Sequence, residues 1–125
     1  MQGVGPSVVL VEDDPGMRQA VGRVLMASGL TTASFANAED ALAVDLSGVG
    51  IFVLDVHLPG MSGFAMYEKL IARGKRESVI FITAHDNPAN RAEAARLGSL
   101  AFLTKPFSGR ELASLVSEAL AQRIS

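Results

Sequence analysis

The chain has 125 residues, of which 49% are apolar, and its formal net charge is −2 at pH 7. This length is typical of one domain, and the apolar content is sufficient for a hydrophobic core. The absence of cysteine excludes disulfides and thiolate metal sites. The near-neutral charge and the lack of tryptophan argue against direct nucleic-acid binding. Because no apolar run reaches about 18 residues, we expect no membrane contact and a cytoplasmic location.

Short apolar blocks alternate with longer segments of helical period, which is typical of repeated βα units around a parallel sheet. The first expected strand covers residues 7–12. The helix after it begins with Asp14 as N-cap and Pro15 at the first helical position, and Gly29 ends it. Its apolar residues recur every three or four positions and are Met17, Val21, Val24 and Leu25.

The middle of the chain continues this alternation. A short alternating strand at 31–35 is typical of a sheet edge, and we expect a helix at 38–45 after it. The strand at 51–55 is apolar on both faces, which predicts a central position covered by helices on each side. A helix at 64–72 and a strand at 78–83 follow.

The fourth helix repeats the start of the first, with Asn87 as N-cap and Pro88 at the first position, and it ends at Gly98. Its expected apolar stripe buries few methylene groups, which fits either close packing or a helix that moves. The stripe comprises Ala89, Ala92, Ala95 and Leu97. A strand at 100–104 then leads through Pro106 to a last helix. The apolar face of that helix comprises Leu112, Leu115, Val116, Ala119 and Leu120.

Polar side chains follow four of these strands at the points where they end. They are Glu12, Asp13, Asp14, Asp55, Thr83, Thr104 and Lys105. Because the carboxyl ends of parallel strands meet at one edge of a sheet, we expect these side chains to form one site.

Carboxylates, a hydroxyl and an ammonium group together suit phosphoryl transfer, which needs an oxygen nucleophile and positive charge around the phosphoryl oxygens. Asp55 is the expected nucleophile and would form an acyl phosphate. Oxygen ligands favour Mg²⁺, or Mn²⁺ in its place; Asp13 and Asp55 would bind it directly, and Glu12 through water. Lys105 would supply a point charge to the phosphoryl group, and Thr83 a hydrogen bond.

The order of these motifs resembles the receiver domain of two-component response regulators over essentially the whole chain. The resemblance rests on the acidic pair after the first strand, Asp with proline and glycine after the third, Thr after the fourth, and Lys-Pro-Phe after the fifth. It implies a doubly wound, flavodoxin-like (βα)5 α/β fold whose five-stranded parallel sheet has the order 2-1-3-4-5, with helices on both faces. Residues 1–125 would form a single receiver domain, either a stand-alone regulator or part of a longer protein.

The resemblance also assigns roles to the acids. In the family, the metal-binding acid lies five residues before an arginine of the first helix, and counting back from Arg18 gives Asp13, with Glu12 as its partner. Asp55 becomes the phosphoacceptor. The backbone carbonyl of His57 becomes a further metal ligand.

Three further positions carry expectations from the family. Thr83 and Lys105 would contact the phosphoryl group, and Thr83 and Phe102 would be the switch residues. Phe102 lacks the hydroxyl that tyrosine provides at this position in many members, so an outward hydrogen bond cannot define its inactive rotamer. The peptide bond between Lys105 and Pro106 is expected to be cis.

His57 and His85 each lie two residues after a proposed site residue. In the family these positions line the approach to the phosphoryl group. One hypothesis is that the two histidines tune the lifetime of the phosphoryl group by gating or orienting water, with a pH dependence near the ordinary imidazole pKa of about 6.5. The alternative is two exposed loop histidines without a role.

The resemblance implies a phosphorylation-dependent signalling switch. A sensor histidine kinase or phosphotransfer protein would donate the phosphoryl group, and the surface of the fourth helix, fifth strand and fifth helix would change. That surface would control an output domain or a downstream protein, or form a homodimer on phosphorylation. The domain would dephosphorylate itself slowly and would not be an enzyme for other substrates.

Three other functions compete with this one. A receiver-like scaffold would act through protein contacts without phosphorylation. A phosphatase or phosphotransferase with an aspartyl phosphate typically needs a second acid two residues after the nucleophile, where His57 stands here. A nucleotide-binding enzyme is disfavoured because no glycine-rich loop follows the first strand.

Overall fold

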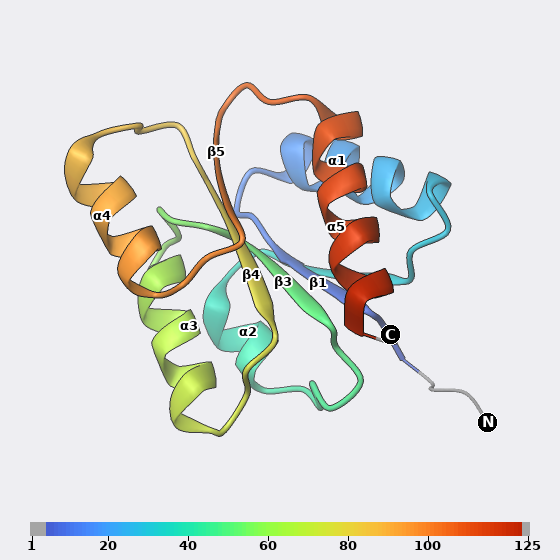
Figure 1. Ribbon diagram of the computed structural model, residues 1–125, viewed down its shortest axis with the longest axis horizontal. Coiled ribbons are helices and arrows are strands. Elements are labelled where there is room, and N and C mark those ends of the chain that lie inside the picture. Colours follow the sequence, from blue (N-terminus) through green and yellow to red (C-terminus); the bar gives the residue numbers. More distant parts are fainter. Residues whose placement is uncertain (1–4, 124–125) are drawn as a thin grey trace.

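The computed structural model describes residues 5–123, which form a central sheet with helices on both faces (Figure 1). The described strands are β1 (Val8–Val11), β2 (Thr32–Phe35), β3 (Ile51–Asp55), β4 (Ser78–Thr83) and β5 (Ala101–Thr104). The described helices are α1 (Pro15–Ala27), α2 (Ala38–Leu42), α3 (Gly63–Ala72), α4 (Pro88–Arg96) and α5 (Gly109–Arg123). Positions 1–4 and 124–125 of the expected domain lie outside the described residues. Within residues 5–123, no helix combines the length and the hydropathy that crossing a membrane requires.

The sheet has the topology that the family resemblance implies. Its strands are parallel and lie in the order β2-β1-β3-β4-β5. Strand β3 is central and buried along its whole length, as expected from its apolar character on both faces. The register pairs Asp55, the last residue of β3, with Ile82 of β4. Thr83, the last residue of β4, therefore lies one position beyond Asp55 along the neighbouring strand. The polar strand ends therefore lie along one edge of the sheet.

Two apolar layers cover the sheet, one on each face (Figure 1). Helices α2, α3 and α4 pack on one side, over a core that includes Phe52 and Phe81. Helices α1 and α5 pack on the other side, over a core that includes Leu25 and Leu112. The apolar faces predicted for the first and last helices point into this second core. Burial on both faces holds the strand ends in fixed positions.

Helix α2 is shorter than the expected 38–45, because it ends at Leu42. The chain turns soon afterwards, and the side chain of Asp45 accepts a hydrogen bond from the N–H of Ser47 at 3.0 Å. The turn allows Leu46 to join the core on this face of the sheet. Burial of an apolar side chain thus ends a helix that the local pattern would have continued.

The apolar stripe predicted for the fourth helix is wrong at most of its positions. Its exposed members are Ala89, Ala92 and Ala95. Among the described residues of α4, Ala94 alone is buried, and Leu97 just after the helix is half-buried. Alanines occur on several sides of α4. Turning the helix about its own axis would therefore change the buried apolar surface only a little. The larger Leu97 and an ion pair from Arg96 to Glu68 of α3 favour the observed rotation.

Helix α3 begins directly against the backbone of Asp55. Gly63, its first residue, donates its N–H to the carbonyl oxygen of Val56 at 3.0 Å. A Cβ atom at position 63 would lie 2.3 Å from the carbonyl oxygen of Asp55, well inside van der Waals contact. Only glycine fits this approach, which places the start of α3 immediately behind the end of β3.

We predict that Gly63→Ala lowers the free energy of unfolding by about 2 kcal/mol or more, because the added methyl group displaces the Asp55 carbonyl. Gly16→Ala in the first turn of α1 is the matched control, since a Cβ there would lie 3.9 Å from Oδ1 of Asp14, an ordinary van der Waals contact. That change should raise stability by up to about 1 kcal/mol. Urea unfolding followed by circular dichroism measures both. Wild-type stability in Gly63→Ala would contradict the close approach.

Candidate functional site

Lys105 joins two carboxylates that come from different strands. Glu12 follows β1, Asp55 ends β3 and Lys105 follows β5. The Nζ atom of Lys105 lies 2.8 Å from Oε1 of Glu12 and 2.9 Å from Oδ2 of Asp55. The peptide bond between Lys105 and Pro106 is cis, the geometry that the resemblance implies. The sheet thus brings together three side chains that are far apart in the sequence.

Both carboxylates are buried, so they need a compensating positive charge. Glu12 is inaccessible to solvent and Asp55 is 3% exposed. Burial raises the pKa of Glu12 and outweighs the nearby ammonium group of Lys105, which acts in the opposite direction. Burial by itself would lower the pKa of Lys105, but its contacts with Glu12 and Asp55 are stronger and raise it. Lys105 is therefore a cation that bridges two buried acids.

The same edge offers oxygen ligands for a divalent cation. Carboxylate oxygens of Glu12, Asp13 and Asp55 lie within 4.8 Å of one another, with Asp13 exposed and the other two buried. Within residues 5–123, Oε1 of Glu12 makes no hydrogen bond of acceptable geometry, although Nζ of Lys105 is close to it. A cluster of oxygen ligands that includes an incompletely satisfied buried oxygen fits a hard divalent cation.

Arg18 of α1 holds the loop that carries the acidic pair. Its guanidinium donates a hydrogen bond to the carbonyl oxygen of Glu12 at 2.8 Å and another to that of Asp13 at 3.4 Å. The N–H of Asp14 donates to Oε2 of Glu12 at 3.1 Å. Asp14 occupies the N-cap position of α1, but its own side chain makes no capping hydrogen bond. In the sequence, Arg18 serves only as the position from which Asp13 is counted back. Its hydrogen bonds to the loop are seen only in the structure.

Two backbone N–H groups connect the loops after β3 and β4 to the side chains that end these strands. His57 donates its N–H to Oδ1 of Asp55 at 3.0 Å, and His85 donates its N–H to the hydroxyl of Thr83 at 2.9 Å. The two exposed imidazole rings meet edge to face, with centroids 4.7 Å apart. Thr83 is fully buried; its carbonyl oxygen accepts the N–H of Lys105 at 2.8 Å, but within residues 5–123 no hydrogen bond joins its hydroxyl to the side chain of Asp55 or Lys105. The contact between the histidines was not predicted from their spacing.

Phe102 lies half-buried on β5, paired in register with Phe81 of β4. The guanidinium carbon of Arg91 lies 5.2 Å from the centroid of the Phe102 ring. Arg91 also donates two hydrogen bonds to the carboxylate of Asp86, at 2.5 and 2.8 Å. Neither Arg91 nor Asp86 stands out in the sequence, because a charged residue on an exposed helix carries no local sign of a distant aromatic partner.

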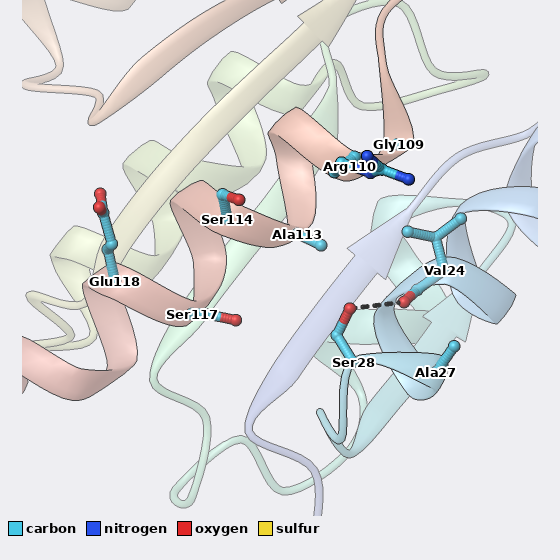
Figure 2. A pocket seen from close by; sticks show the side chains of 9 residues that line it. All are labelled: Val24, Ala27, Ser28, Gly109, Arg110, Ala113, Ser114, Ser117 and Glu118. Carbon is cyan, nitrogen blue, oxygen red and sulfur yellow. Dashed lines mark hydrogen bonds between the residues drawn. The ribbon is translucent and has the colours of Figure 1, made fainter.

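A groove of about 660 Å³ lies between α1 and α5, away from the acids (Figure 2). Small side chains such as Ala113 and Ser117 line it, together with Arg110 and Glu118. It contains none of the residues that the strand ends bring together. The charged edge of the sheet is the better candidate for function, because it holds buried ionisable groups with shifted pKa values.

The fold and the site define a doubly wound α/β protein whose functional groups lie at the carboxyl edge of its sheet. The profile of the response regulator receiver domain matches residues 8–117. The chain therefore belongs to the family of response regulator receiver domains. The cluster of Glu12, Asp13 and Asp55 fits the metal site typical of this family.

Curated relatives include the C4-dicarboxylate transport transcriptional regulatory protein DctD of Rhizobium meliloti (strain 1021), 35% identical over 108 residues. The transcriptional regulatory protein TdiR of Thauera aromatica is 32% identical over 120 residues. The matches cover 86% and 95% of this chain, but only 24% and 53% of the relatives, which are named as regulators and not as enzymes. Among solved structures, the receiver domain of the Francisella response regulator 1452 has a TM-score of 0.84 and 25% identity, covering 95% of this chain and 99% of that chain.

We predict that Glu12→Gln raises the free energy of unfolding at neutral pH without divalent metal, because it removes a buried carboxylate whose charged form is disfavoured. A raised pKa means that the folded state binds this proton more tightly than the unfolded state, so the cost of ionised Glu12 appears as the pH rises above 4.5, its ordinary value. The advantage of the variant should therefore vanish as the pH falls to about 4. Urea unfolding in EDTA measures this difference, and a variant less stable than wild type at neutral pH would contradict it.

Proposed function

We propose that this chain is a phosphorylation-dependent signalling switch that accepts a phosphoryl group on Asp55. The donor would be a phosphohistidine of a sensor histidine kinase or of a phosphotransfer protein. The observation that carries the proposal is the ion pair from Lys105 to Asp55, beside three clustered carboxylates, in a chain of the receiver family. A protein cation and a candidate cation site then both adjoin the same nucleophile.

In the proposed transfer, a carboxylate oxygen of Asp55 bonds to phosphorus while the phosphorus–nitrogen bond to the donor imidazole breaks, and the imidazole keeps the electron pair. Lys105 would turn its ammonium group to the phosphoryl oxygens as a point charge. The Thr83 hydroxyl already accepts the N–H of His85, so its own proton can be donated to a phosphoryl oxygen. Attack of water on phosphorus would slowly release inorganic phosphate and restore Asp55.

Glu12, Asp13 and Asp55 would hold Mg²⁺, or Mn²⁺ in its place, with the backbone carbonyl of His57 as a further ligand. When bound, the cation neutralises negative charge on the carboxylates and on the incoming phosphoryl oxygens. The contacts of Arg18 with the loop after β1 support this role, because they keep the acidic pair at the edge of the sheet.

The phosphorylated state would be read at Thr83 and Phe102 and on the surface of α4, β5 and α5. This surface would control an output domain or a downstream protein, and could also pair with a second copy of the chain. Exposed small side chains of α4 support such a contact; they are Ala89, Ala92 and Ala95. The domain would act on itself and not on a separate substrate. It would work in the cytoplasm, without binding nucleic acid or membrane directly.

We predict that acetyl phosphate with Mg²⁺ adds one phosphoryl group to the wild-type chain, because Asp55 can displace acetate as it would displace an imidazole. Asp55→Asn should abolish the added mass in intact-protein mass spectrometry. Asp45→Asn is the matched control, since Asp45 is exposed and its side chain bonds only to the nearby Ser47 in the described residues. EDTA should suppress labelling of the wild type.

Labelling that survives Asp55→Asn would overturn the site assignment. A wild-type chain that responds to neither acetyl phosphate nor beryllofluoride with Mg²⁺ would instead favour the scaffold that works without phosphorylation. Turnover of a small phosphomonoester would favour a phosphatase.

We also propose that His57 and His85 limit the access of water to the phosphoryl group. Their rings are in contact, and their backbone N–H groups bond to Asp55 and Thr83. We predict that His85→Ala increases the rate of phosphoryl loss by about twofold or more, because removal of the imidazole ring leaves a gap through which water can reach the phosphoryl group. Rates of dephosphorylation after removal of the donor measure this effect, with Lys69→Ala as an exposed control on α3. Equal rates for His85→Ala and wild type between about pH 6 and 8 would remove the hypothesis.

A further inference from the structure

The outer face of the Phe102 ring is covered by a cation. Phe102 is half-buried on β5, and the guanidinium carbon of Arg91 lies 5.2 Å from the centroid of its ring. At this distance a guanidinium is attracted to the negative face of the ring, and its methylene groups can cover apolar surface. Phe102 has no hydroxyl group that could fix its position by a hydrogen bond. The contact with Arg91 instead holds the ring in place.

Arg91 is itself held from the other side by Asp86. The carboxylate accepts hydrogen bonds from Nε and from a terminal nitrogen of Arg91, at 2.5 and 2.8 Å. This fork fixes the plane of the guanidinium group. The side chains of Arg91 and Asp86 are 58% and 36% exposed, so the contact has the modest strength of a surface interaction.

Asp86 lies in the loop that leaves Thr83. The N–H of His85 donates to the Thr83 hydroxyl at 2.9 Å, and the carbonyl of His85 accepts a hydrogen bond from Nδ2 of Asn90 at 2.9 Å. These bonds connect Thr83, the loop and the first turn of α4. A displacement of Thr83 would therefore move Asp86, and with it the guanidinium group over Phe102.

We propose that Asp86 and Arg91 form a latch that holds Phe102 in the unmodified chain and opens when Thr83 moves toward a phosphoryl group. This inference rests on the proposed function and specifies how the same site is regulated. A contact that stabilises the unmodified arrangement lowers the affinity for a phosphoryl group by the same free energy. For an exposed contact between a cation and a ring, that corresponds to about two- to fivefold in an equilibrium constant.

The test is a titration with beryllofluoride and Mg²⁺, a stand-in for the phosphoryl group, followed by nuclear magnetic resonance. Arg91→Met keeps much of the aliphatic stem and removes the guanidinium group, so it should bind about two- to fivefold more tightly than wild type. Asp86→Asn should shift the affinity in the same direction. Arg96→Met is the matched control, because Arg96 lies on the same helix but bonds to Glu68 of α3. It should bind as wild type does.

A double substitution separates the latch from a general loosening of α4. In a Phe102→Leu background, Arg91→Met should cause no further change in affinity, because the partner of the guanidinium group is already absent. An undiminished effect of Arg91→Met in that background would overturn the latch.

The resonances of the Phe102 ring give a second readout in the unmodified chain. Arg91→Met should shift them, and Arg96→Met should leave them in place. Wild-type affinity in Arg91→Met, in a protein that does bind beryllofluoride, would overturn the latch alone. Failure of the wild type to bind beryllofluoride would overturn the proposed function, and the ring resonances would then decide whether Arg91 holds Phe102.

Discussion

Two buried carboxylates at the end of the sheet constrain the structure around them. Glu12 follows β1 and Asp55 ends β3, and the carboxylates of both are buried away from water. The positive charge of Lys105 lies between them and compensates both. Because Lys105 follows β5, this ion bridge joins the ends of β1, β3 and β5. The start of α3 at Gly63 and the bonds of Arg18 to the loop after β1 support the same arrangement.

Lys105 does not fully compensate the burial of the two carboxylates, so a bound cation could compensate them further. Burial still raises the pKa of Glu12 despite its contact with Lys105, and an oxygen of Glu12 lacks a hydrogen bond within the described residues. A ligand that binds the folded chain and satisfies such groups stabilises it. Under the proposed function, a divalent cation would do so at the acids, while Lys105 would be available for the negative charge of a phosphoryl group on Asp55.

Helix α4 differs from the other helices, because polar contacts hold it more than an apolar face does. Ala94 is its one buried residue among those described, whereas Arg91 and Arg96 bond to Asp86 and Glu68 at the surface. Exposed ion pairs are individually weak, so a small change at a neighbouring strand end can redistribute them. This makes α4 and the strand beside it a suitable place for a local charge to alter a larger surface.

The order of the elements, the parallel sheet and the edge that carries the acids follow from the sequence, because hydrophobic period and strand-end residues are local signals. Convergence of Asp55 and Lys105 follows as well, since parallel strands end at one edge. The end of α2, the buried side of α4, and the contact of Arg91 with Phe102 were decided only by the tertiary structure. In each case the local alternatives differ by little free energy, and burial of Leu46 or contact with a distant residue selects among them.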